Sequence, residues 1–118
     1  MPAGAVTKLR SIKSRRDFLA ARGAPGVATP GFRLVRRKRE DMDAPRAGFT
    51  ITKKLGNAVV RNRIRRRLRA AIAEVLLTGG EAGCDYIVIA RARAADRPFA
   101  LLLDDLEGAL LTLAQKGA

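Results

Sequence analysis

The chain has 118 residues, of which 24 are lysine or arginine and 11 are aspartate or glutamate, giving a formal net charge of +13. This length supports a single domain with one hydrophobic core. The chain has no histidine and a single cysteine, Cys84, which excludes zinc fingers, histidine-based acid–base catalysis, most transition-metal sites and an intramolecular disulfide.

The first ordered element expected is a short helix over residues 14–22. Residues 1–10 are expected to form a flexible basic N-terminus, because they are small and polar and lack the apolar stretch of a signal peptide. Ser14 is a candidate N-cap, with Asp17 three residues later. Residues 24–31 are rich in proline and glycine, which predicts a loop.

Two strands are expected next, over residues 31–38 and 46–52. In both segments, a set of side chains that includes a phenylalanine alternates with a second set, as residues on the two faces of a strand do. The alternation places Phe32 on one face of the first strand, opposite a basic face, and Phe49 on one face of the second. Residues 40–45 between them predict a turn or a longer hairpin loop.

A basic helix is expected over residues 58–77, after a turn at residues 53–57. From Lys53 to Ala71 the chain holds eight basic residues and no acidic one. At 100° per residue, the basic side chains and an apolar stripe separate onto different faces of this helix. Like charges four residues apart repel one another, so the basic face is expected to meet a polyanion, namely nucleic acid. The apolar stripe consists of Val60, Ile64, Leu68, Ala71, Ile72 and Val75.

The last two elements lie in residues 70–118, which carry a net charge of −3. Residues 85–93 read as a central strand that is apolar on both faces, and Cys84 just before it is expected to be buried. Asp96 is expected to cap the final helix, with Pro98 in its first turn. The apolar stripe of that helix is expected to belong to the core. It consists of Phe99, Leu102, Leu103, Leu106, Leu110 and Leu113.

Together these elements predict an α+β fold, a small two-layer sandwich in which a mixed sheet carries helices on one side. The expected order is helix, two or three strands, helix, strand, helix. The domain is expected to span residues 11–115, with a C-terminal tail at residues 116–118. No stretch approaches the length of a membrane span, and a cytoplasmic location is expected.

The basic segment KKLGNAVVRNRIRRRLR resembles the signature of the bacterial ribonuclease P protein subunit. The flanks agree, since Asp17–Phe18 lies in the first expected helix, GFTIT precedes the signature and DYIVIAR follows it. The resemblance covers about residues 8–115. The matching positions are Lys53–Lys54, 56–59, Arg61–Asn62–Arg63, Arg66 and Arg69.

The resemblance implies a left-handed strand–helix–strand crossover, which the residues alone would not indicate, since about 98% of such crossovers are right-handed. It also implies an endoribonuclease in which a catalytic RNA, with magnesium, removes the 5′ leader from precursor tRNA. The protein would bind the catalytic RNA and the single-stranded leader. No metal bound by the protein and no obligate protein partner are expected.

By position, the resemblance assigns two groups of residues. The catalytic RNA would contact Lys53, Lys54, Asn57, Arg61, Asn62, Arg63, Arg65, Arg66 and Arg69. The leader would lie in a cleft between the first helix and the sheet, bordered by Phe18, Arg22, Phe32, Arg33 and Phe49. Arg22 stands where the family often has a second aromatic residue, and Val35 is nearest to an aromatic position of the first strand. Arg22 and Arg33 are therefore expected to bind the leader electrostatically.

From the residues alone, three other functions stay open. A basic ribosomal protein or ribosome-assembly factor would prefer ribosomal RNA. A DNA-binding architectural module would bind duplex DNA, which would then compete with RNA for the protein. The chain has no helix-turn-helix spacing, however. An autonomous nuclease would cleave with magnesium alone, but the adjacent Asp104 and Asp105 would not face one another on a helix.

Overall fold

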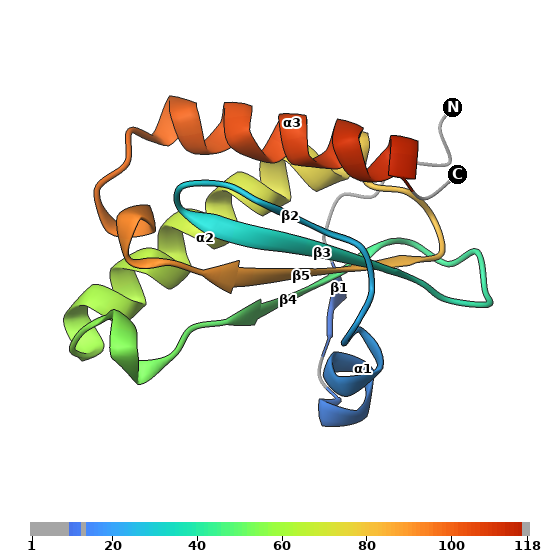
Figure 1. Ribbon diagram of the computed structural model, residues 1–118, viewed down its shortest axis with the longest axis horizontal. Coiled ribbons are helices and arrows are strands. Elements are labelled where there is room, and N and C mark those ends of the chain that lie inside the picture. The colour runs from blue at the N-terminus through green and yellow to red at the C-terminus, as the bar shows by residue number, and fades with distance from the viewer. Residues whose placement is uncertain (1–9, 13, 117–118) are drawn as a thin grey trace.

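The computed structural model describes residues 10–12 and 14–116. Its centre is a five-stranded sheet in the order β1-β4-β5-β3-β2 (Figure 1). The strands are β1 (Arg10–Ser11), β2 (Gly26–Ala28), β3 (Phe32–Lys38), β4 (Arg46–Thr50) and β5 (Cys84–Ala90). The helices are α1 (Arg15–Ala20), α2 (Ala58–Gly79) and α3 (Phe99–Lys116), with 3₁₀ turns η1 (Lys53–Leu55) and η2 (Ala92–Ala95).

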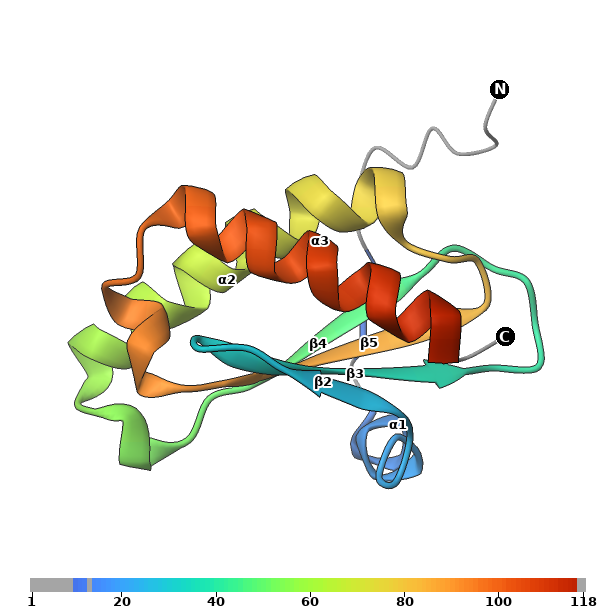
Figure 2. The same cartoon turned by 45° about the horizontal axis from the view of Figure 1, so that its top comes forward.

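Two helices cover one face of the sheet and the third lies on the other. Helices α2 and α3 pack side by side on one face, and α1 lies against the opposite face (Figures 1 and 2). The main core fills the space under α2 and α3, and a smaller cluster of Ile12, Ala21, Val35 and Ile87 lies under α1. This confirms the α+β sandwich but corrects the expectation that all helices share one face.

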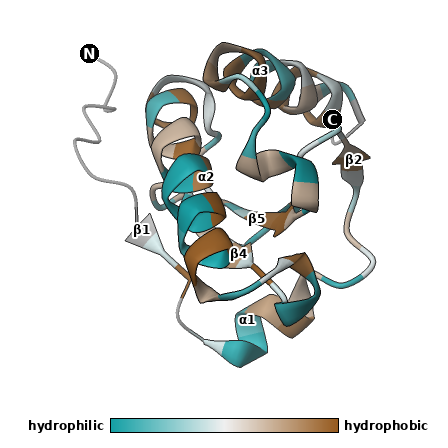
Figure 3. Cartoon of the chain, turned by 90° about the vertical axis from the view of Figure 1, so that its left-hand side faces the viewer, coloured by the Kyte–Doolittle hydropathy of each residue, from teal (hydrophilic) through white to brown (hydrophobic). Residues whose placement is uncertain are grey.

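The apolar stripes of the two long helices point into the main core. Ile64 and Leu68 of α2 and Leu102 and Leu106 of α3 are each at most 2% exposed, whereas Figure 3 shows hydrophilic residues along the outer side of α2. Phe99 is the exception in the predicted α3 stripe, since 37% of its surface is exposed at the start of the helix. Burial of the two stripes is therefore what attaches both helices to the sheet.

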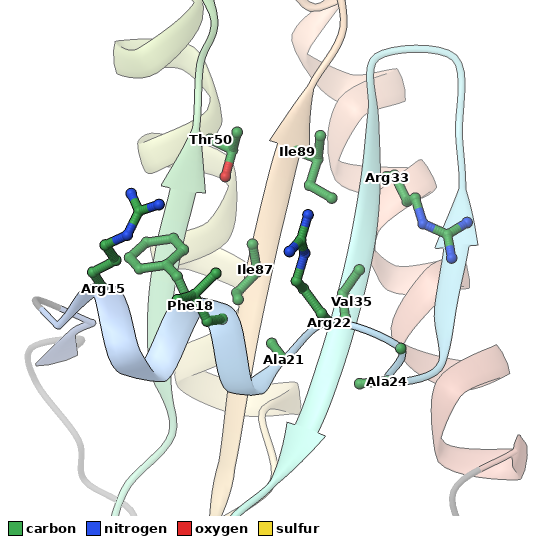
Figure 4. A pocket seen from close by; sticks show the side chains of 12 residues that line it. Arg15, Phe18, Ala21, Arg22, Ala24, Arg33, Val35, Thr50, Ile87 and Ile89 are labelled. Carbon is green, nitrogen blue, oxygen red and sulfur yellow. The ribbon is translucent and has the colours of Figure 1, made fainter.

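The connection from β4 through α2 to β5 is left-handed. Strands β4 and β5 are parallel neighbours, with Phe49 paired to Val88. Seen from the α1 side (Figure 4), both strands point upward, β5 lies to the right of β4, and α2 passes behind the sheet. A right-handed crossover would place α2 on the α1 side. This handedness agrees with the family resemblance and leaves the α1 face of the sheet open.

Two edge strands were not predicted from the sequence. Residues 26–28, expected as loop, form β2 and pair antiparallel with β3. Arg10, expected in a flexible N-terminus, lies in β1 and pairs in parallel with Arg46 of β4. Residues 1–9 of that expected segment lie outside the described residues.

Several boundaries also differ from the sequence prediction. Helix α1 ends at Ala20 rather than at residue 22, and β4 ends at Thr50 rather than at residue 52. Strand β5 ends at Ala90 rather than at residue 93, because η2 follows directly. Helix α3 begins at Phe99, and the carbonyl of Pro98, not the side chain of Asp96, stands at its start and accepts from the backbone of Leu102. Lys116 ends α3 instead of beginning a tail. None of the described helices combines the length and the apolar character needed to cross a membrane.

Candidate RNA-binding surfaces

The basic helix α2 starts at a sharp reversal of the chain. Gly56 has a φ of +141°, a backbone conformation that residues other than glycine rarely adopt. The next residue, Asn57, caps α2, because its Oδ1 accepts a hydrogen bond from the backbone N–H of Val60 at 3.0 Å. The reversal brings the exposed Lys53 and Lys54 of η1 beside the first turn of α2. Since the cap uses the amide oxygen of Asn57, an RNA contact by this residue is left to its amide nitrogen.

The predicted basic face of α2 is solvent-facing. The apolar stripe of this helix is buried, so most of the remaining side chains project away from the sheet. Arg61 and Arg65 are half-buried and the other predicted arginines are more exposed. The structure therefore brings together the whole group that the sequence assigned to an RNA contact. It comprises Lys53, Lys54, Asn57, Arg61, Asn62, Arg63, Arg65, Arg66 and Arg69.

Two arginines on this face are held in place by neighbours that leave donors free. Arg65 Nη1 donates to Asn62 Oδ1 at 2.8 Å. The guanidinium carbon of Arg69 lies 5.8 Å from the centre of the Phe49 ring, which is within the range of a cation–π contact. Guanidinium groups that are already oriented lose less freedom when they bind phosphate, because their planar fork is pre-organised.

Arg67 has a structural task instead. Its guanidinium donates to the carbonyl of Ala94 at 2.9 Å and also to the carbonyl of Arg97. Arg97 in turn bonds Asp105 of α3 at 2.6 Å. This arrangement ties η2 to both long helices, so Arg67 does not belong to the solvent-facing group.

A cleft opens on the other side of the sheet, between α1 and the strands. Its volume is about 520 Å³. Val35, Ile87 and Ile89 form an apolar floor, and Phe18 and Thr50 lie at one side (Figure 4). The positively charged side chains at its border are Arg15, Arg22 and Arg33. An apolar floor with a cationic border suits a single-stranded nucleic acid, whose bases are apolar on their faces and whose backbone is anionic.

Of the five residues expected to border a cleft between the first helix and the sheet, three line it and two do not. Phe18, Arg22 and Arg33 line the cleft together. Phe32 is 1% exposed and belongs to the core under α2 and α3, and Phe49 packs against that same core. Both phenylalanines therefore point to the face of the sheet opposite the cleft. The reason is the two-residue period of a strand, which places Phe32 and Leu34 on one face and Arg33 and Val35 on the other.

Arg15 lines the cleft but was not predicted from the sequence. It precedes Phe18 by three residues, a spacing that places both side chains on one face of α1. The floor residues Ile87 and Ile89 stand two positions apart in β5, so they lie on one face of that strand. The periods of a helix and of a strand, applied to the sequence, would have identified Arg15, Ile87 and Ile89 as residues of the cleft.

Gly48 determines how closely α1 approaches the sheet. A Cβ atom at this position would lie 2.6 Å from the Phe18 ring, closer than van der Waals contact allows. Gly48→Ala is expected to push Phe18 and α1 outward and to lower the free energy of unfolding by about 1 kcal/mol. Urea denaturation would measure the loss, and an unchanged stability would show that the Phe18 ring moves aside without cost.

A buried carboxylate with three arginines lies beside the cleft. Asp85 of β5 is 0% exposed and accepts from Arg39 Nη1 at 2.6 Å and from Arg46 Nε and Nη2 at 2.8 Å each. Arg37 Nη1 lies 3.4 Å from Asp85 Oδ2. Burial acts to raise the pKa of Asp85, but the hydrogen bonds and the positive charges of Arg46 and Arg39 together outweigh it and hold that pKa below its ordinary value. Asp85 is therefore charged in the folded protein at neutral pH.

Comparison with known proteins places the chain in a family. The family model for ribonuclease P matches residues 6–114. The chain belongs to the ribonuclease P protein family. The ribonuclease P protein component of Paramagnetospirillum magneticum is 44% identical over 108 residues, covering 87% of this chain and 81% of that protein. The corresponding protein of Gluconacetobacter diazotrophicus is 45% identical over 109 residues, covering 91% and 93%.

Solved structures of ribonuclease P proteins share the fold. That of Staphylococcus aureus is 34% identical with a TM-score of 0.73, covering 89% of this chain and 95% of that chain. That of Thermotoga maritima is 26% identical with a TM-score of 0.68, covering 86% and 94%. The chain is thus a protein component of ribonuclease P, the ribonucleoprotein endonuclease of tRNA processing.

Proposed function

We propose that this ribonuclease P protein binds two RNA segments at once. The solvent-facing group on η1 and α2 contacts the catalytic RNA, and the cleft between α1 and the sheet holds the single-stranded 5′ leader of precursor tRNA. The observation that supports this division is the left-handed crossover, which leaves the cationic face of α2 and the cationic border of the cleft on different sides of the sheet. Each surface is then available to a separate RNA.

The role of the protein is to reduce the repulsion between these two RNAs. A domain with a net charge of +13 neutralises phosphates that would otherwise repel one another, and so lowers the salt needed for assembly. We place the hydrolysis of the phosphodiester bond in the RNA subunit, together with magnesium ions held by RNA phosphates. No carboxylate is among the described residues that line the cleft. Asp17 and Asp85 are engaged by arginines, which leaves them unsuited to metal binding or proton transfer.

Reconstitution tests the proposal directly. The purified protein and a bacterial ribonuclease P RNA are mixed at low magnesium, and release of the leader from a precursor tRNA is followed. Cleavage is expected only when both components are present, and raising magnesium is expected to reduce the dependence on protein. A protein that binds this RNA tightly without stimulating cleavage would contradict the proposal.

A further inference from the structure

Helix α1 is attached to the sheet by few apolar contacts. It has six residues, and none of them is fully buried. Phe18 packs on Gly48, and Ala21 just after the helix is 4% exposed. Gly23 follows with a φ of +82° and open space around it. So short a helix needs tertiary contacts to persist, and these apolar contacts are concentrated at its C-terminal half.

One carboxylate supplies the attachment at the other half. Asp17 Oδ1 lies 3.6 Å from Arg37 Nη1 of β3, and Asp17 Oδ2 lies 3.4 Å from Arg46 Nη2 of β4. Arg37 and Arg46 are also the partners of the buried Asp85 on β5 between them. Asp17 thus connects α1 to a group of side chains that spans three adjacent strands.

We propose that Asp17 is a positioning residue that fixes α1 over the sheet and thereby sets the opening of the cleft for single-stranded RNA. Asp17 precedes Phe18, and the border of the cleft also holds Arg15 of this helix and Arg22 of the turn that follows it. A shift of α1 would move all three of these side chains relative to the floor formed by β3 and β5. This inference rests on the proposed function of the cleft as the leader site.

The negative charge of Asp17 allows a positioning role to be distinguished from a purely electrostatic one. A carboxylate next to a cleft that binds phosphates repels those phosphates, so its charge alone weakens RNA binding. Removing that charge would tighten binding if Asp17 did nothing else. If Asp17 holds α1 in place, removing the charge weakens binding in spite of the gain in net positive charge. The sign of the change therefore separates the two roles.

The experiment compares Asp17→Asn with Asp41→Asn in the reconstituted holoenzyme. Asp41 pairs with Arg39, which bonds Asp85, so this control removes one negative charge from the same network without touching α1. Affinity is measured for precursor tRNA with a long single-stranded leader and with a single-nucleotide leader. Asp17→Asn is expected to weaken binding of the long leader about twofold to fivefold, the range of a partly exposed ion pair. Binding of the short leader, and of the catalytic RNA by the protein alone, is expected to stay unchanged.

The controls distinguish a failure of the positioning role of Asp17 from a failure of the proposed leader site. Asp17→Glu restores the carboxylate and is expected to recover most of the affinity for the long leader, whereas Asp41→Asn is expected to leave it equal or tighter. If Asp17→Asn tightens binding as Asp41→Asn does, or if Asp17→Glu binds no better than Asp17→Asn, the positioning role is overturned. If the wild-type holoenzyme does not distinguish the long leader from the short one, the proposed function of the cleft fails instead. Circular dichroism and thermal unfolding confirm that each variant is folded at the assay temperature.

Discussion

Asp85→Asn is expected to lower the free energy of unfolding by about 3 kcal/mol at neutral pH, the scale for removing one partner of a buried ion pair. The carboxylate is fully buried, and its two oxygens are bonded by Arg39 and Arg46. An amide at this position can accept fewer hydrogen bonds and carries no charge to offset the arginines. Urea denaturation of the two proteins would measure the difference.

The pH dependence of the same group provides a second test. Because the pKa of Asp85 is lowered in the folded state, its contribution to stability is fully present above the ordinary aspartate pKa of about 3.9. That contribution is lost as the pH falls through the lowered folded-state pKa. The wild-type protein is therefore expected to lose stability more steeply than Asp85→Asn in this acid range.

A control variant separates Asp85 from aspartates in general. Asp104 is exposed on α3, so Asp104→Asn is expected to change the free energy of unfolding by less than about 0.5 kcal/mol and to keep the acid behaviour of the wild type. Equal stability of Asp85→Asn and Asp104→Asn at neutral pH would show that the arginine cluster does not hold the strands together.

Apart from α1, which was predicted from its N-cap Ser14, the elements that the sequence predicted are those whose own residues carry a period. Helices α2 and α3 and strands β3, β4 and β5 each bury a repeating apolar set, and this set is readable without knowing the partner. Strands β1 and β2 have two and three residues, too few for a period to appear. They exist because a neighbouring strand offers them backbone hydrogen bonds, and that information lies elsewhere in the chain.

The cleft was predicted only in part, for a related reason. Phe32 and Phe49 were assigned to it by position from the family resemblance, although their strand positions place them with the apolar residues of the main core. Applying the two-residue period consistently would have selected Val35 and Thr50 instead. In this protein, the face of a strand determines whether a residue lines the cleft, and residue type does not.

The tasks of individual arginines could not be read from the sequence at all. Arg67 and Arg69 stand two positions apart in one basic run, yet Arg67 bonds backbone carbonyls of residues 94 and 97 and Arg69 lies over Phe49 in β4. The partners are distant in the chain, so spacing within the helix does not identify them. Net charge predicts an RNA-binding protein, whereas the three-dimensional partners decide which cations are free to bind.

The double variant Arg65→Ala/Arg69→Ala is expected to weaken binding of the catalytic RNA roughly thirtyfold at physiological salt. If the group on η1 and α2 neutralises about six phosphates, log K falls against log salt with a slope of roughly −4 to −5. Removing two of these contacts is expected to flatten the slope by about 1.5 units, and the affinity difference between the variant and the wild type shrinks as salt rises. Filter binding over a range of salt concentrations would measure both quantities.

The matched control removes the same charge from the opposite side of the sheet. Arg15→Ala/Arg22→Ala lowers the net charge by two as well, but both side chains border the cleft. This pair is expected to leave the salt slope for the catalytic RNA nearly unchanged and to weaken binding of precursor tRNA with a long leader. If both pairs flatten the slope equally, the protein binds RNA through its overall charge rather than through two separate surfaces. A difference between the pairs would instead mean that the left-handed crossover, by placing α2 and the cleft on different faces of the sheet, decides which RNA each arginine contacts.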